Sequence, residues 1–258
     1  MLDLKQIESF YPEPLRPFKR NLLREYLQYK ILEAIYLSKF SEKLSFMGGT
    51  AIHIIHSNAR FSEDLDFDNL GLTREEFTEL TEIVKRRMNL EGYEVEIRNS
   101  FRQAYRARIN IKNLLYESGL SSHKEEKMPI HLDVEPQKFK YKPDKVIINK
   151  FDIFTKIYAV PIEVLLSQKI YAILMRRRPM GRDFYDAIFL FGKTKPDMDY
   201  LKVKLASRDW PDIKTMLLKR CENLDFGTLA EDVRHFLFNP SDAGKVSLFC
   251  EYIQKYVW

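Results

Sequence analysis

The sequence has little cysteine, glycine or proline, with two, nine and eleven residues of each in a chain of 258. Two cysteines cannot form a disulfide framework, so we expect a reducing compartment, the cytoplasm. The shortage of glycine and proline excludes collagen-like and low-complexity proteins. Apolar runs of the roughly 18 residues that a membrane helix needs are missing. The opening stretch MLDLKQIESF also lacks the apolar core of a signal peptide, and we expect no association with a membrane.

Apolar and aromatic residues, by contrast, are abundant. Hydrophobic residues make up 45% of the chain and aromatic residues 13%, which provides for a sizeable core and excludes disorder as the main state. A chain of this length forms one or two domains. Lys and Arg exceed Asp and Glu by 42 to 37, a net charge of +5. This mild basic excess is compatible with a nucleic-acid partner without requiring one.

The first part of the chain mixes helical and extended patterns. Residues 14–44 carry apolar residues at three- and four-residue spacings, which predicts one or two amphipathic helices. Short strands are predicted at 44–47, where glycines end an apolar run, and at 64–67, where polar and apolar residues alternate. The other elements expected here are a helix over 51–56 capped by Thr50, a helix over 73–90 begun by Thr73 and Glu76, three or four neighbouring strands between 93 and 136, an arm over 137–145 and one short strand within 146–154.

After residue 161 the pattern becomes helical throughout. The predicted helices cover residues 162–177, 183–192, 199–206, 211–222, 228–237 and 245–257. Glycine or proline separates most of them. We therefore expect an α+β fold, in which residues 1–155 form strands with flanking helices and residues 156–258 form a helical domain.

Two aspartates alternate with apolar residues in the segment RFSEDLDF, residues 60–67. Asp64 and Asp66 are two positions apart on a predicted strand, so both side chains lie on one face. Two carboxylates side by side repel each other unless a cation lies between them, and oxygen-only ligands suit Mg²⁺ or Mn²⁺. The pair therefore predicts a divalent metal site of the kind that clamps a phosphoryl displacement.

A third carboxylate is available in the later segment HLDVE. Alternation places Asp133 and Glu135 on one face of this predicted strand. If the strand lies next to that of Asp64 and Asp66, one of the two acids can complete the metal site. Asp133 is the first choice, and Glu135 is the alternative.

A glycine pair lies between the strand predicted at 44–47 and the helix that follows. Glycine allows the backbone to approach a ligand closely, and the N–H groups and dipole at a helix N-terminus favour phosphate. Gly48, Gly49 and Thr50 therefore predict a phosphate site. A D-x-D pair alone is more often a solvated strand edge, and G-G-T alone is more often a simple turn. Their combination, one short helix apart, favours phosphoryl chemistry.

The order of these motifs resembles the nucleotidyltransferase superfamily, and specifically its AbiEii/AbiGii toxin branch. The superfamily signature is a hydrophobic residue, two small residues, a short helix and D-x-D. The matching residues are Met47, Gly48, Gly49, the helix from Ala51, and Asp64 with Asp66. The resemblance implies a nucleotidyltransferase-type mixed sheet with flanking helices, a glycine turn that holds the triphosphate of an NTP, and a D-x-D pair that ligates Mg²⁺. The third acid of the family matches Asp133, and Glu135 remains its rival.

Two further motifs of the branch occur in the helical half. One is the segment EVLLSQKIYA, residues 163–172, and the other is GRDFYD, residues 181–186. The resemblance implies that Lys169 acts at the nucleotide phosphates and that Asp183 is catalytically important. Asp186, three residues farther on, is expected to be structural and to pair with Arg182 or Lys169.

The resemblance implies an enzyme that moves a nucleoside monophosphate from an NTP to an acceptor hydroxyl and releases pyrophosphate. It also implies the toxin half of a toxin–antitoxin or phage-defence pair, with tRNA as the acceptor and an antitoxin encoded nearby. Basic stretches at 138–150 and 176–178 would suit an RNA backbone or a triphosphate. Two other functions stay open: a non-catalytic nucleotide- or RNA-binding module, against which the intact acids argue, and a small-molecule transferase of the antibiotic-resistance kind, against which the R-D-x-x-D motif argues.

Overall fold

The computed structural model describes residues 2–206 and 209–256 and divides the chain into two compact units. The first unit comprises Met1–His56, Phe61–Lys138 and Pro143–Ala159. The second begins at Val160 and extends to the end of the chain, and it also takes in two short segments, Ser57–Arg60 and Phe139–Lys142. The chain therefore leaves the first unit and returns to it twice before the helical half begins.

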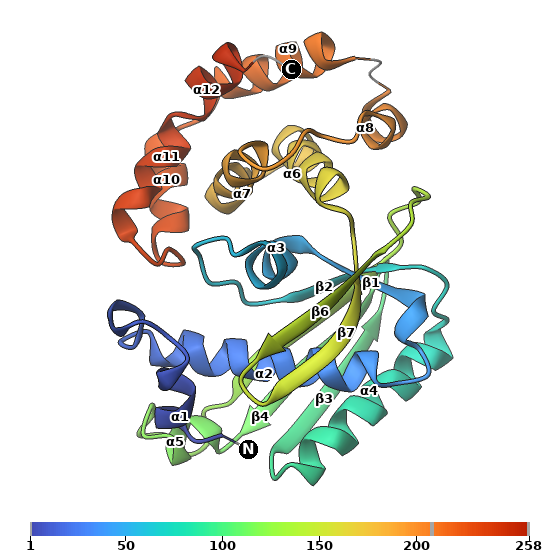
Figure 1. Cartoon of the computed structure of the whole chain (residues 1–258), viewed down its shortest axis with the longest axis vertical. Helices are drawn as coiled ribbons and strands as arrows, with labels where there is room; N and C mark the ends of the chain where they lie inside the picture. The colour runs from blue at the N-terminus through green and yellow to red at the C-terminus, as the bar shows by residue number, and fades with distance from the viewer. Residues whose placement is uncertain (1, 207–208, 257–258) are drawn as a thin grey trace. The chain divides into compact units, whose positions relative to one another are not determined.

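A seven-stranded mixed sheet forms the centre of the first unit, in the order β3-β4-β5-β2-β1-β7-β6 (Figure 1). The strands are β1 (Leu44–Met47), β2 (Leu65–Asn69), β3 (Glu94–Phe101), β4 (Tyr105–Lys112), β5 (Met128–Glu135), β6 (Asp144–Lys150) and β7 (Ile153–Ala159). Two neighbouring pairs, β2 with β5 and β1 with β7, are parallel, and the other pairs are antiparallel. The expected α+β fold with a mixed sheet is confirmed.

Two sequence predictions about the strands were wrong. Asp64 precedes β2, which begins at Leu65, so only Asp66 of the acid pair lies within the strand. The single short strand predicted within 146–154 is instead a hairpin of β6 and β7, joined by a turn at Phe151 and Asp152. Phe151 adopts a left-handed conformation, with φ +60°, that a residue of its type rarely takes.

The helices of the first unit are α1 (Leu4–Ser9), α2 (Lys19–Tyr36), α3 (Gly48–His56), α4 (Arg74–Leu90) and α5 (Leu114–Glu117). In Figure 1, α2 and α4 lie across the sheet. Tyr36 of α2 packs against Phe67 of β2, and Phe77 of α4 packs against Tyr105 of β4, with ring centroids 6.3 and 5.6 Å apart. The predicted start of α4 is confirmed, because Thr73 and Glu76 cap each other's backbone N–H groups.

The second unit is helical in the part of the chain that the structure describes. Its helices are α6 (Ile162–Met175), α7 (Gly181–Phe191), α8 (Met198–Leu205), α9 (Trp210–Cys221), α10 (Phe226–Arg234), α11 (Gly244–Ser247) and α12 (Phe249–Lys255). The helix predicted over 245–257 is interrupted at Leu248, and its last residue lies outside the described residues. A Cβ on Gly181 would lie 1.8 Å from the carbonyl oxygen of Leu229, so glycine permits α7 and α10 to pack closely.

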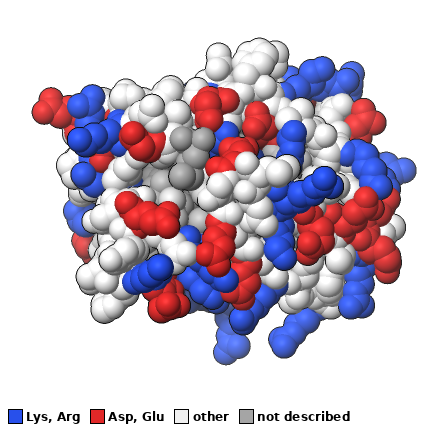
Figure 2. Space-filling model, turned by 90° about the horizontal axis from the view of Figure 1, so that it is seen from below, with Lys and Arg blue, Asp and Glu red and all other residues white. Residues whose placement is uncertain are grey.

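Acidic and basic side chains are interspersed over the face of the molecule that Figure 2 shows. Cys221 and Cys250 are free thiols. None of the helices described is both long enough and apolar enough to cross a membrane.

Candidate active site

The glycine turn joins β1 directly to α3. Gly48 has φ +78°, a left-handed conformation that favours glycine. A Cβ at Gly48 would lie 2.2 Å from Oδ2 of Asp66, so any side chain would collide with the carboxylate. The turn and Asp66 are therefore neighbours in space, and the first N–H groups of α3, which have no partner within the helix, begin beside this carboxylate.

Thr50 does not cap the helix as predicted, because α3 already begins at Gly48. Its side chain is fully buried, and its hydroxyl donates a short hydrogen bond to the backbone carbonyl of Asp64. The Thr50 hydroxyl thus fixes the residue that precedes β2. Only the backbone N–H of Thr50 remains for the phosphate contact expected from the sequence.

The acids meet across the parallel strands β2 and β5. Asp66 is in register with Asp133, and Asp68 is in register with Glu135. Asp68 is buried and accepts a hydrogen bond from the backbone N–H of Gln137, at 2.7 Å. The register therefore favours Asp133 over Glu135 as the partner of Asp66.

Two basic side chains lie against these acids. Nε of Arg106 is 3.3 Å from Oδ2 of Asp133, and Nδ1 of His131 is 3.3 Å from Oδ1 of Asp64. Burial raises the pKa of Asp133 above its ordinary value; Arg106 and His131 oppose the rise, and the charge of Asp64 adds to it. A carboxylate whose pKa is raised in this way holds its negative charge at a cost that a cation would relieve.

A divalent cation was expected at these acids, and their chemistry fits one. Asp64, Asp66 and Asp133 supply only carboxylate oxygens, the ligands that Mg²⁺ prefers. Within residues 2–206 and 209–256, no three His, Cys, Asp or Glu side chains are gathered closely enough to hold a metal. Asp64 faces His131 and Asp133 faces Arg106, so these contacts must loosen before three carboxylates can share one ion.

Helix α3 is anchored by a buried carboxylate on α2. Glu25, with 3% of its side chain exposed, contacts Nε2 of His53 at 3.0 Å and Nζ of Lys150 at 2.6 Å. Burial alone would raise the pKa of Glu25, but His53 and Lys150 outweigh burial and lower it to about 2. Through this cluster α2 and β6 hold the helix whose N-terminus forms the glycine turn.

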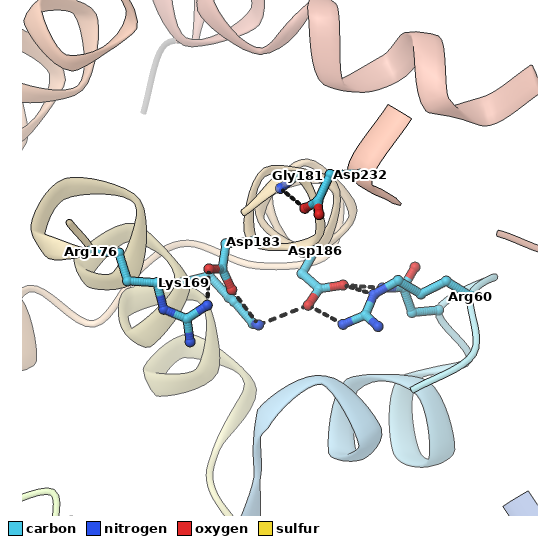
Figure 3. Close-up of polar contacts among 8 residues, drawn as sticks. Arg60, Lys169, Arg176, Gly181, Asp183, Asp186 and Asp232 are labelled. Atoms are coloured by element: carbon cyan, nitrogen blue, oxygen red, sulfur yellow. Dashed lines mark hydrogen bonds and ion pairs between the residues drawn. The ribbon is translucent and has the colours of Figure 1, made fainter. Parts of the chain in front are cut away.

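The two site residues expected in the helical half, Lys169 and Asp183, both lie in the second unit and touch each other. Nζ of Lys169 is 2.9 Å from Asp183 and 2.9 Å from Asp186 (Figure 3). Burial favours the neutral amine, but the two carboxylates outweigh it and raise the pKa of Lys169. Lys169 is therefore a charged ammonium enclosed by two acids of α7.

Arg60 completes this network from the segment that precedes the acids of the first unit. Its Nε and Nη2 each donate a hydrogen bond of 2.6 Å to Asp186, and Asn58 donates one of 2.8 Å to the same carboxylate. Arg60 and Lys169 hold the pKa of Asp186 below its ordinary value although burial opposes them. The expected pairing of Asp186 with Lys169 is present. Its arginine partner, however, is Arg60, while Arg182 lies over the ring of Phe236.

Sequence reasoning missed four residues of these clusters: Arg60, Arg106, His131 and Arg176. Arg60 opens the motif RFSEDLDF, and its place in that motif was the only signal that could have pointed to it. Arg176 was counted in a basic stretch, but its Nη1 lies 2.9 Å from Oδ2 of Asp183. Arg106 and His131 become recognisable only once the register of β4, β5 and β2 is known.

The chain matches the model of a protein family. Residues 30–245 match the family model described as nucleotidyl transferase AbiEii toxin, type IV TA system. This range includes the glycine turn, the acids of β2 and β5 and both motifs of the helical half. None of the curated proteins matches the sequence.

Two solved structures show the same fold at low sequence identity, and a third resembles the chain less closely. JHP933 from Helicobacter pylori matches with a TM-score of 0.56 and 17% identity, over 91% of this chain and 92% of its own. A second H. pylori structure, described as a candidate nucleotidyltransferase, has the same score and identity and covers 91% of this chain and 94% of its own. A nucleotidyltransferase-like antigen of Paracoccidioides brasiliensis matches with a TM-score of 0.44 and 18% identity, over 73% of this chain and 91% of its own. The two H. pylori matches confirm the fold expected from the sequence.

Proposed function

The chain belongs to the AbiEii family of nucleotidyltransferase toxins, and we propose that it transfers a nucleoside monophosphate from an NTP to a hydroxyl group of tRNA with Mg²⁺ as its cofactor. The enzyme class and the toxin class follow from the family. The acceptor, the metal and the site residues are the proposal.

One observation carries the proposal: the glycine turn, Asp66 and Asp133 lie side by side. Gly48 has no room for a side chain beside Asp66, and Asp66 is in register with Asp133. A helix N-terminus favours phosphate, and adjacent carboxylates favour a divalent cation. Phosphate groups held at the turn would therefore lie next to the acids that carry out the transfer.

Different residues of the first unit bind the phosphates and the metal. Gly48, Gly49 and Thr50 hold the β- and γ-phosphates through backbone N–H groups. Asp64, Asp66 and Asp133 would hold Mg²⁺, which when bound neutralises charge on the phosphate oxygens.

In the transfer, the acceptor oxygen forms a bond to the α-phosphorus, the bond from that phosphorus to the bridging oxygen breaks, and pyrophosphate leaves. The acceptor hydroxyl gives its proton to Asp133.

For the second unit we keep the roles that the family implies. Lys169 supplies positive charge at the phosphates, and Asp183 is catalytically important. The positive charge of Lys169 supports its role at the phosphates. Asp183 and Asp186 hold the pKa of Lys169 above the ordinary value although burial lowers it. Asp186, bonded to Arg60 and Asn58, is the structural member of this group.

A type IV toxin works against an antitoxin, and we propose that the antitoxin is encoded beside this chain. Two other functions are weaker. A non-catalytic binding module would not need Asp66 beside a glycine turn and in register with Asp133. A small-molecule transferase would not need the R-D-x-x-D helix whose acids hold Lys169.

Incubation of the protein with labelled NTPs, bulk tRNA and bulk protein, with Mg²⁺, Mn²⁺ or EDTA, tests the proposal. We expect label in tRNA, dependence on the metal, and no label with Asp66→Asn at an unchanged melting temperature. Asp199→Asn, at an exposed position of α8, is the matched control and should keep full activity. Label that appears only in protein or in small molecules would replace tRNA as the acceptor. Full activity of Asp66→Asn would refute the acid site.

A further inference from the structure

The face of the sheet that carries the acids continues over β5, β4 and β3. On β4, Tyr105 packs against Phe77 of α4, so its neighbour Arg106 points to the opposite face. By the same alternation, Arg108 and Asn110 share the face of Arg106. Arg106 contacts Asp133, so this is the face on which the acids lie.

The register of the strands aligns side chains of neighbouring strands in two rows across this face. The first row runs from Asp66 through Asp133 and Arg106 to Ser100. The second row runs from His131, which contacts Asp64, through Arg108 to Arg98. In the first row the carboxylates of β2 and β5 give way to a guanidinium group on β4. The second row has no carboxylate on a strand, and its two members beyond His131 are both arginines. The surface therefore changes from negative to positive in the direction away from the glycine turn.

The outer end of the second row has more cations than carboxylates to neutralise them. The side chain of Arg98 is 76% exposed and pairs with Glu96, which also pairs with Lys127. Arg108 has no carboxylate partner among the residues that the structure describes. Three cations thus face one carboxylate.

These cations surround a hollow of about 340 Å³ lined by Arg98, Arg108, Asn110 and Lys127. We call these four residues the basic face. Asn110 is 5% exposed, and its Oδ1 is buried without a hydrogen-bond partner in the part of the chain described. A buried acceptor without a donor is costly, and a ligand that brings a hydroxyl or amino group would satisfy it.

We propose that the basic face binds the sugar–phosphate backbone of the RNA acceptor. The inference rests on the proposed function and names the surface that its acceptor uses. Guanidinium groups pair with phosphate through two hydrogen bonds, and Oδ1 of Asn110 accepts a hydrogen bond from a ribose 2′-hydroxyl, which DNA lacks. The hollow is lined by polar side chains, whereas protein interfaces have apolar centres, so RNA is favoured over a protein.

The basic face is close enough to the acids for one RNA chain to contact both. Neighbouring strands lie about 4.8 Å apart, so β4 is about 10 Å from β2, where Asp66 lies. An RNA chain that rests on the arginines of β3 and β4 can therefore present its terminal hydroxyl to the acids without leaving the sheet. Basic stretches noted in the sequence at 138–150 and 176–178 are not needed for this contact.

Binding of fluorescently labelled bulk tRNA to the full chain, measured over a series of salt concentrations, tests the proposal. The variant is Arg98→Ala with Arg108→Ala. The charge-matched control is Arg86→Ala with Arg87→Ala, two exposed arginines of α4. We expect the basic-face variant to weaken tRNA binding about tenfold for each arginine. The slope of log Kd against log salt should fall by about 1.4, as expected for two lost phosphate contacts with a single strand.

The control should bind tRNA nearly as tightly as the unaltered protein, and all three should bind NTP equally. If both double variants weakened tRNA binding equally, the attraction would be unspecific and the proposal would be overturned. Unchanged tRNA affinity of the basic-face variant would also overturn it. If transfer labels a protein, and the KM for that protein rises only in the basic-face variant, the face binds protein and the proposal is wrong. If tRNA binds through the face but receives no label, the proposed function fails and the docking surface stands.

Discussion

Arg60 donates two hydrogen bonds of 2.6 Å to Asp186, and both side chains are almost fully buried. Removing one partner of such a pair leaves an uncompensated buried charge, which costs about 3–5 kcal/mol. We therefore predict that Arg60→Ala lowers the stability of the second unit by several kcal/mol and that Arg60→Lys, which cannot form both bonds, restores only part of it. Arg177→Ala, at an exposed position, should change the melting temperature little. Equal melting temperatures for Arg60→Ala and Arg177→Ala would contradict this account.

Gly48→Ala should abolish activity and lower stability, because the new Cβ would lie 2.2 Å from Asp66 and the residue keeps φ +78°. Gly71→Ala is the matched control, since it also has a positive φ, +126°, but open space around it. Both variants place a residue with a Cβ at a positive φ, which costs about 1–2 kcal/mol of stability. Only Gly48→Ala should displace a catalytic acid. Thermal melting and transfer assays on the two variants separate the effects, and equal activities would mean that the turn and Asp66 are not coupled.

Lys169→Ala should lower transfer by roughly 10²-fold or more and weaken NTP binding, as expected when one preorganised electrostatic contact is lost. Lys169→Arg should rescue part of the activity, because guanidinium is not a compact point charge. A purely structural Lys169, held by Asp183 and Asp186, predicts a lower melting temperature with normal NTP affinity in the folded protein. Calorimetric titration of NTP into folded Lys169→Ala distinguishes the two roles, and unchanged affinity and turnover would exclude the phosphate role.

Acid should destabilise the first unit through Glu25. Its pKa is about 2 in the folded protein, below its ordinary value, so the stabilisation is complete above pH 4.5 and is lost as the pH falls towards 2. The shift corresponds to about 3 kcal/mol. Glu25→Gln should therefore be less stable at pH 7 and lose less on acidification, as measured by urea unfolding at pH 7 and pH 3.5.

The control for this prediction is Glu126→Gln. The hydrogen bond from Arg20 also lowers the pKa of Glu126 to about 2, but this pair lies at the surface, where solvent screens it. Its loss should leave the acid response of the melting temperature almost unchanged. If Glu126→Gln changed the stability lost on acidification as much as Glu25→Gln does, burial would not be the reason for the large contribution of Glu25 to stability.

Expression of the protein in bacteria should slow growth, and Asp64→Ala should relieve the effect at an equal protein level. Asp64 is one of the three proposed metal ligands, and its backbone carbonyl is held by Thr50 whatever its side chain. Growth curves with immunoblots of protein level measure this. Full toxicity of Asp64→Ala would separate toxicity from the proposed acid site.

Local signals in the sequence were sufficient for some elements and not for others. The start of α4 was predictable because Thr73 and Glu76 are three residues apart and cap one another. The hairpin of β6 and β7 was not, because its turn contains Phe151 in a left-handed conformation in place of glycine or asparagine. Aromatic rings from distant residues, among them Tyr26 and Tyr29, pack around Phe151 and hold it there.

In the candidate site, too, some residues could be predicted from local sequence patterns and others could not. The acids and the glycine turn carry local patterns, so Gly48, Asp66 and Asp133 could be selected from the sequence. The pairing of Asp66 with Asp133 depends on strand order, and the bond from Arg60 to Asp186 joins residues 126 positions apart. No short-range periodicity encodes such contacts, because they arise when the whole chain packs.

The strand order of the sheet also determines when the proposed acid pair can form during synthesis of the chain. β1 lies between β2 and β7, and β2 lies beside β5, although β5 and β7 come much later in the chain. A ribosome therefore releases Asp66 long before Asp133 has been made, and one edge of β1 stays open until β7 emerges. The proposed acid pair cannot form on the partly made chain, so the proposed site is complete only after the later strands have been translated.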